Sequence, residues 1–80
     1  MTNQIAVPDT LQDAPPSVKL VWAVLDDADE ALDQQAIEDR TKLPNPTVRS
    51  ALYELELTDH VDHHPDPADA RRREYYLLSE

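Results

Sequence analysis

The sequence contains no cysteine and no glycine among its 80 residues. Without cysteine it cannot form a disulfide or hold a metal ion through thiolates, which suits an intracellular protein. Without glycine it cannot build the glycine-rich loop that cradles phosphates in many nucleotide-binding enzymes. No turn in the chain relies on glycine for a positive φ. These absences already exclude several common classes of enzyme.

Long apolar runs are also missing. No stretch approaches the roughly 18 apolar residues that a membrane span needs, and the amino terminus lacks the basic and apolar segments of a signal peptide. The carboxylates are spread along exposed helix ends and are not gathered in an apolar cleft that would favour acid–base catalysis. We therefore predict a cytoplasmic protein that does not associate with membranes, is not an enzyme and uses no cofactor.

Basic residues are scarce: there are 17 acidic and 7 basic residues, giving a net charge of -10. Only two of the bases are lysines and most acids are aspartates, as in proteins adapted to a high-salt cytoplasm. At 1 M salt the Debye length is about 3 Å, so the local charge pattern matters more than the sum. Residues 1–39 hold nine acids and one base, whereas residues 40–80 hold eight acids and six bases.

The length allows one small domain, which we place at residues 15–80. Residues 1–14 show no sustained period and are expected to form a flexible tail. Residues 15–25 fit either a strand or a helix, but one apolar face repeats at i, i+3, i+4 and i+7, which favours a helix. That face comprises Val18, Val21, Trp22 and Leu25. Asp26, Asp27 and Asp29 are expected to end this helix.

A second helix is predicted over residues 34–40, after an extended connector at 30–32. Asp33 stands where its carboxylate can cap the free amides of the first turn, and Ala36 and Ile37 face inwards. A break follows at residues 41–44, because a residue that precedes proline avoids the helical conformation.

A third helix is predicted from Asn45 to Leu57, with Asn45 as its cap and Pro46 at its first position. Its buried stripe comprises Val48, Ala51, Leu52 and Leu55. Residues 60–64 then form a short strand, residues 65–69 a turn, and residues 71–78 the returning strand. The chain is therefore expected to be mostly α with a small β-hairpin (α+β): a winged helix-turn-helix with three helices and a two- or three-stranded wing sheet.

Residues 43–56, followed by His60-Val61 and then residues 66–72, resemble the recognition helix and wing of MarR-type winged helix-turn-helix transcriptional regulators. The likeness is strongest to small archaeal versions, such as those of haloarchaea, and extends over residues 15–78. It implies binding of double-stranded DNA by a homodimer. The sequence ends two residues after the wing strand, without the long helix through which larger MarR proteins pair. A dimer would therefore be joined through the first helix and the tail.

The resemblance implies that the helix Asn45–Leu57 enters the major groove and that the wing Asp66–Arg73 contacts the minor groove or the backbone. On the exposed face of the helix, Arg49 can pair with guanine, while Thr47 and Ser50 suit phosphates or a thymine methyl group. The other predicted contacts of the helix and of the preceding turn are Asn45, Tyr53, Arg40 and Lys42. The alternative for all of them is an ordinary solvated surface.

The run Arg71-Arg72-Arg73 is the only basic cluster in this acidic chain. Strand alternation is expected to send Arg71 and Arg73 to one face and Arg72 to the other, and at least one could enter a narrow minor groove. The alternative is that these arginines form exposed salt bridges, each of little energetic value. Their possible partners are Asp62, Asp66, Asp69 and Glu74.

The histidines His60, His63 and His64 around Asp62 suggest a metal site. Such a site is not expected, since His63 and His64 would point to opposite faces of a strand, and cysteine and helical i, i+4 spacing are both missing. Trp22 and Tyr75 are expected in the core and not as stacking platforms for bases.

As an alternative to DNA binding, the domain could be a protein-interaction module that docks a basic partner through the acidic surface of residues 1–39. A DNA mimic, whose carboxylates would imitate phosphates, is disfavoured by the basic wing.

Overall fold

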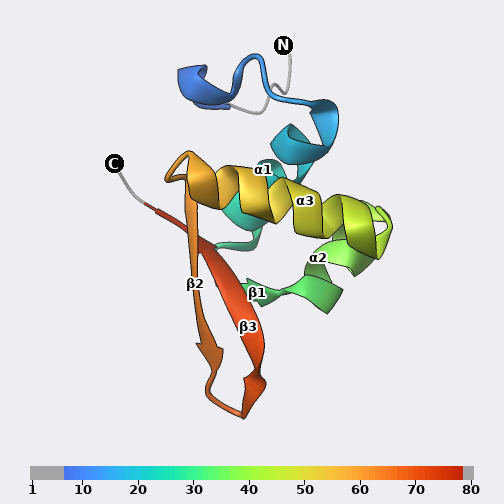
Figure 1. Ribbon diagram of the computed structural model, residues 1–80, viewed down its shortest axis with the longest axis vertical. Coiled ribbons are helices and arrows are strands. Elements are labelled where there is room, and N and C mark those ends of the chain that lie inside the picture. The colour runs from blue at the N-terminus through green and yellow to red at the C-terminus, as the bar shows by residue number, and fades with distance from the viewer. Residues whose placement is uncertain (1–6, 79–80) are drawn as a thin grey trace.

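The computed structural model describes residues 7–78, which form three α-helices, a short 3-10 helix and a three-stranded antiparallel sheet (Figure 1). The helices are η1 (Asp9–Leu11), α1 (Pro16–Ala28), α2 (Gln34–Thr41) and α3 (Asn45–Leu57). The strands are β1 (Leu32–Asp33), β2 (Val61–Asp66) and β3 (Asp69–Leu77), in the spatial order β1-β3-β2. The predicted fold class is confirmed.

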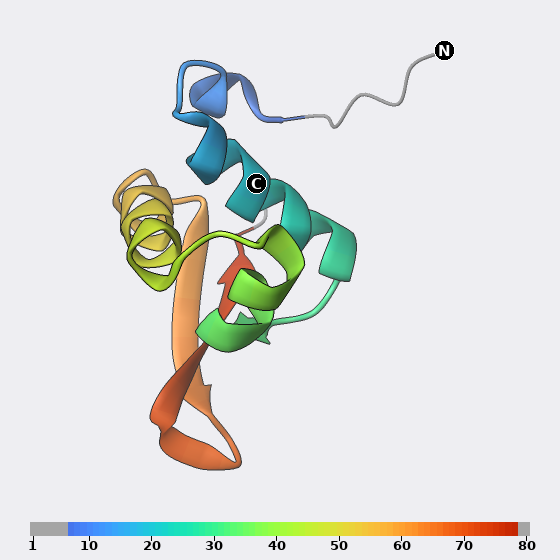
Figure 2. The ribbon, with the colours of Figure 1, turned by 90° about the vertical axis from the view of Figure 1, so that its right-hand side faces the viewer.

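The three helices lie together, and the hairpin of β2 and β3 projects away from them (Figures 1 and 2). One hydrophobic core joins the helices to the sheet, and burying each large side chain contributes about 1.5–3 kcal/mol. Its members are Leu11, Val18, Val21, Leu25, Leu32, Ile37, Val48, Ala51, Leu52, Leu55, Val61 and Tyr75. The predicted stripe of α3 is thus confirmed. Within residues 7–78, no helix is long and apolar enough to span a membrane.

The amino-terminal segment belongs to the domain from Val7 onwards. Leu11 is only 2% exposed and packs in the core. The Thr10 hydroxyl lies 2.6 Å from Nε2 of His60, which ties η1 to the loop after α3. Residues 7–14 therefore pack against the core and are not a loose tail, since Val7 and Ala14 are partly buried beside Leu11. The domain boundary at residue 15 stays a prediction. Residues 1–6 of that tail lie outside the described residues.

Three helix ends use a positive φ without glycine. Asp29 follows α1 with φ 57°, Lys42 follows α2 with φ 63°, and Asp59 follows α3 with φ 61°. This left-handed conformation costs a residue with a β-carbon roughly 1–2 kcal/mol, although Asp tolerates it better than Lys. Asp29 ends α1 as expected, whereas Asp26 and Asp27 still lie within the helix.

Two polar side chains act at the starts of α2 and α3. Asp33 caps α2 as predicted, because its Oδ1 accepts a hydrogen bond of 2.8 Å from the backbone N–H of Ala36. Asn45 does not cap α3: it is the first helical residue, and Pro44 takes the cap position in an extended conformation. The Asn45 amide instead donates to Oε2 of Glu38 at 2.8 Å, so it links α3 to α2.

The β2–β3 hairpin is longer than expected and turns over only two residues, Pro67 and Ala68. Its register is regular from Val61 opposite Leu77 to Pro65 opposite Arg73, and then Asp66 pairs with Asp69. Residues 70–72 of β3 therefore have no partner in β2 and form a bulge. Proline at position 65 favours this irregularity, since it has no N–H to donate to the ladder.

Candidate nucleic-acid interface

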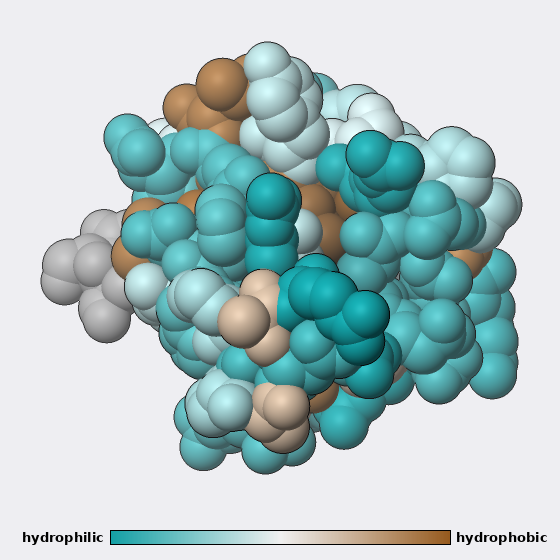
Figure 3. Space-filling view, turned by 60° about the horizontal axis from the view of Figure 1, so that its bottom comes forward, coloured by the Kyte–Doolittle hydropathy of each residue, from teal (hydrophilic) through white to brown (hydrophobic). Residues whose placement is uncertain are grey.

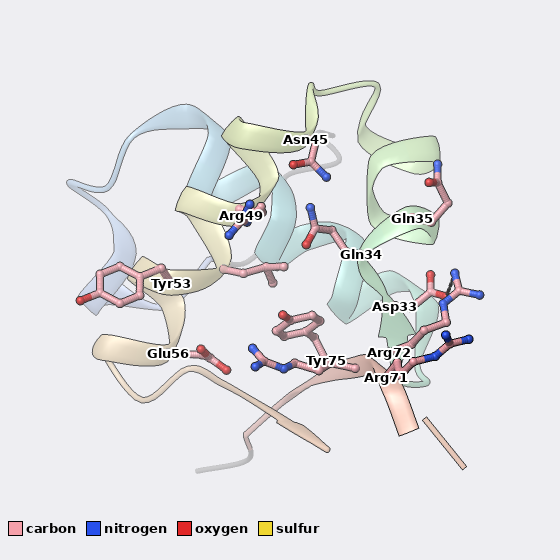
Figure 4. A pocket seen from close by; sticks show the side chains of 12 residues that line it. Asp33, Gln34, Gln35, Asn45, Arg49, Tyr53, Glu56, Arg71, Arg72 and Tyr75 are labelled. Atoms are coloured by element: carbon pink, nitrogen blue, oxygen red, sulfur yellow. Dashed lines mark ion pairs between the residues drawn. The ribbon is translucent and has the colours of Figure 1, made fainter. Parts of the chain in front are cut away.

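A groove of about 600 Å³ lies between α3, the start of α2 and strand β3 (Figure 4). Leu52 and Tyr75 are core residues, so they form its apolar floor. The polar side chains around them come from segments far apart in the sequence. They are Asp33, Gln34, Gln35, Asn45, Arg49, Tyr53, Glu56, Arg71, Arg72 and Arg73.

The α3 side of the groove is formed by one face of the helix. Asn45, Arg49, Tyr53 and Glu56 follow one another at intervals of three or four residues, so their side chains stack along this face. Tyr53 is 64% exposed. Arg49 is exposed too, and among the described residues no ion pair holds it. Its guanidinium is therefore available for an anion or a base edge.

All three wing arginines line the same groove. The predicted alternation, with Arg71 and Arg73 on one face and Arg72 on the other, stays a prediction. It assumes a regular ladder, and the ladder is interrupted by the bulge at residues 70–72. The bulge gathers three positive charges along one edge, opposite the exposed face of α3.

Two of these arginines are held by aspartates. Nη2 of Arg72 lies 2.9 Å from Oδ2 of Asp33, the dashed contact in Figure 4, and Nε of Arg71 lies 3.2 Å from Oδ1 of Asp69. The hydrogen bonds from Arg71 lower the pKa of the Asp69 carboxyl below its usual value. Such exposed pairs are weak because solvent screens them, so a phosphate can replace the carboxylate at little cost. For Arg73, no ion pair is recorded within residues 7–78.

Four predicted contact residues lie outside the groove. Ser50 and Thr47 are roughly 100° and 160° around α3 from Arg49, given 3.6 residues per turn, and Thr47 is half-buried. Arg40, in the last turn of α2, and Lys42, directly after this helix, are exposed. The DNA contacts assigned to these four residues stay predictions, as do those assigned to the six groove residues.

Four groove residues were missed from the sequence. Gln34 and Gln35 open α2 directly after its cap, and amide side chains there suit phosphates or adenine edges. Two adjacent polar residues after a capping aspartate are the signal that could have found them. Asp33 and Glu56 add negative charge, so the groove holds four arginines and two carboxylates.

The surface seen from the wing tip is mostly hydrophilic, with apolar residues showing only as small patches between polar ones (Figure 3). The groove is net positive in a chain whose net charge is -10. Helices α2 and α3 joined by a short turn, followed by a projecting hairpin that pairs with β1, define a winged helix-turn-helix domain.

Solved structures of transcriptional regulators share this fold. PcaV from Streptomyces coelicolor, solved with its natural ligand, has a TM-score of 0.77 and 25% identity over 85% of this chain and 48% of its own. A DNA complex of MepR from S. aureus has a TM-score of 0.74 and 25% identity over 84% and 55% of the two chains. A probable transcriptional regulator from Pseudomonas aeruginosa has a TM-score of 0.78 at 18% identity, over 84% and 50%.

These similar proteins are transcriptional regulators of the MarR type, and the winged-helix fold that the resemblance implied is confirmed. The chain spans about half the length of each of them. No protein-family model matches the chain, and no curated protein sequence matches it significantly.

Proposed function

We propose that this protein is a sequence-specific DNA-binding transcription regulator. In this proposal α3 enters the major groove, and the wing, residues 66–73, lies on the minor groove or the backbone. The observation that carries it is the gathering of four arginines from α3 and β3 around one groove of an acidic protein. The DNA complexes of the similar MepR structures support it.

The geometry suits a duplex. A major groove about 12 Å wide admits an α-helix, and the exposed guanidinium of Arg49 can then pair with O6 and N7 of a guanine. Arg73 and its two neighbours lie on the wing, across the groove from α3. From there they could enter a narrow minor groove of the DNA, whose negative potential attracts arginine. Gln34 and Gln35, at the start of α2, would contact the backbone between these two elements.

We further propose that the protein acts in concentrated salt, as in the cytoplasm of a halophilic archaeon. The excess of aspartate and the scarcity of lysine support this setting. Screening there weakens the repulsion between DNA and the acids of α1. A homodimer joined through α1 and the amino-terminal segment would place two copies of α3 on a pseudo-palindromic site.

Binding to labelled genomic fragments in potassium salt, followed by fluorescence anisotropy, tests the DNA-binding proposal. We expect a small set of fragments to bind far more tightly than the rest, and equal, weak binding to all fragments would contradict sequence specificity. Arg49→Ala should relax the preference among fragments, whereas Arg72→Ala should lower affinity for all of them.

A second candidate function is docking of a basic protein through the acidic surface of α1. The exposed acids Asp26, Asp27, Asp29 and Glu30 at the end of this helix favour it. Capture of a basic protein that is lost on neutralising these four residues, together with no DNA binding at any salt concentration, would favour docking over DNA binding.

A further inference from the structure

Glu56, Asp62 and His63 gather three potential metal ligands beside the groove. Glu56 lies in the last turn of α3, and Asp62 and His63 lie at the start of β2. One oxygen or nitrogen atom from each lies within 4.8 Å of the other two. Nδ1 of His63 is 2.5 Å from Oε2 of Glu56, so the helix and the strand already meet here.

The surroundings hold these side chains in place while leaving them accessible. The ring of His63 packs against Tyr75, with the ring centroids 5.7 Å apart. Oδ1 of Asp62 accepts a 2.8 Å hydrogen bond from the backbone N–H of His63, which orients the carboxylate. The side chains of His63 and Glu56 are 34% and 30% exposed, so a hydrated ion can reach them and keep water in its remaining positions.

We propose that Glu56, Asp62 and His63 bind a divalent first-row transition-metal ion such as Zn²⁺ or Mn²⁺. One imidazole and two carboxylates form a mixed nitrogen and oxygen donor set, in which the imidazole suits Zn²⁺ and the carboxylates suit Mn²⁺. Zinc–ligand bonds of about 2.0–2.2 Å place ligand atoms about 3.0–3.5 Å apart. The three ligand atoms already lie within 4.8 Å of one another, and Nδ1 of His63 and Oε2 of Glu56, now 2.5 Å apart, would separate slightly to admit the ion.

A metal site was not expected from the sequence, because His63 and His64 would point to opposite faces of the strand. The structure confirms this arrangement of the two histidines. His64 does point away from His63, towards Glu74 on the other face of the hairpin, with Nε2 3.9 Å from Oε1. The third ligand comes from α3 instead of from a second histidine. Glu56 precedes His63 by seven residues, and only the tight loop at residues 58–60 brings them together.

Bound metal would connect the recognition helix to the wing. Glu56 also lines the arginine groove, so a cation at its carboxylate cancels negative charge where phosphates would approach. On the proposed DNA-binding function, metal-loaded protein therefore binds DNA more tightly, by about threefold to tenfold for one screened charge.

Isothermal titration of the DNA-free protein with ZnCl2 and with MnCl2 tests the site. About 1 M KCl suppresses diffuse attraction of cations to the acidic surface. We expect saturation at one ion per chain, and a loss of affinity of at least about tenfold in Glu56→Gln, Asp62→Asn and His63→Gln. The matched controls Glu54→Gln on α3 and His64→Gln on β2 should change affinity by less than about twofold.

Equal losses in the controls, or no saturable binding, would overturn the site. If a variant fails to fold, the site can still be tested by adding Mn²⁺ to the unaltered protein. Its paramagnetism should broaden the resonances of Glu56, Asp62 and His63 before those of Glu54 and His64, and uniform broadening would refute a localised site.

A DNA titration with and without Zn²⁺ then tests the link to DNA. Tighter binding that disappears in Asp62→Asn supports it, and unchanged or weaker binding refutes the link. Saturable metal binding in a protein that binds no DNA would keep the site and overturn the proposed function, so the two failures are distinguishable.

Discussion

Asp33 makes two interactions that substitution can separate. Its Oδ1 caps α2 by accepting from the N–H of Ala36, and its Oδ2 pairs with Arg72 in the groove. Asp33→Ala removes both interactions. Asp33→Asn keeps an oxygen for the cap, since Asn ranks with Asp at this position, but it loses the charge that holds Arg72.

The two losses differ in size. Replacing an N-cap by Ala costs about 1 kcal/mol, with a range of about 0.5–2. The pair with Arg72, whose side chain is 51% exposed, is worth about 0.2–1 kcal/mol after solvent screening. We therefore expect Asp33→Ala to lower the free energy of unfolding by roughly 1.5 kcal/mol and the Tm by roughly 6–12 °C. For Asp33→Asn we expect roughly 0.5 kcal/mol and 2–4 °C.

The affinity of Asp33→Asn for DNA should rise, although its free energy of unfolding falls. Asp33→Asn removes a carboxylate from the groove and releases Arg72, so affinity for the selected duplex should rise. The slope of log K against log salt should steepen by up to about 0.9, corresponding to one more neutralised phosphate. Thermal unfolding and fluorescence anisotropy measure the two effects. If Asp33→Asn were as unstable as Asp33→Ala, or bound DNA less tightly, this account of Asp33 would be refuted.

Four further predictions concern single residues. Leu11→Ala should lower the free energy of unfolding by about 2–5 kcal/mol in urea titrations, because Leu11 is a core residue, and an unchanged midpoint would show that η1 does not anchor the chain. Lys42→Gly should stabilise the protein by about 1 kcal/mol, since glycine tolerates its φ of 63°, and any destabilisation would contradict that reason. The lowered pKa of Asp69 means that its hydrogen bonds with Arg71 persist above the ordinary carboxyl pKa of 3.8 and break as pH falls through the lower folded value. An NMR titration of the Asp69 carboxyl measures this pKa, and a midpoint at or above pH 3.8 would contradict the lowered pKa. Arg49→Ala should reduce the salt slope of DNA binding by about 0.9, whereas Lys19→Ala on α1 should leave it unchanged.

The helices were predictable because their periodicity and proline positions are local signals. The stripe from Val48 to Leu55 and the break before Pro44 both follow from residues close together in sequence. The anchoring of Leu11 was not predictable in this way, since it depends on packing against residues far along the chain.

The site was only partly predictable. Arg49 and Tyr53 follow from helical period and resemblance, but the position of Arg72 depends on a bulge whose place is set by the pairing of β3 with β2. Asp33 was predicted as a cap, yet its second contact with Arg72 requires the sheet pairing of β1 with β3. Glu56 joins the groove because α3 packs across the hairpin, which is again a tertiary effect.

Amide chemical-shift mapping during titration with a selected duplex tests the central claim most directly. If the groove between α3 and the wing binds DNA, the largest changes will fall at Gln34, Asn45, Arg49 and Arg73 and will saturate together. The acidic end of α1, around Asp27, will show little change. Changes concentrated on α1, or none that saturate at any potassium concentration, would contradict the account.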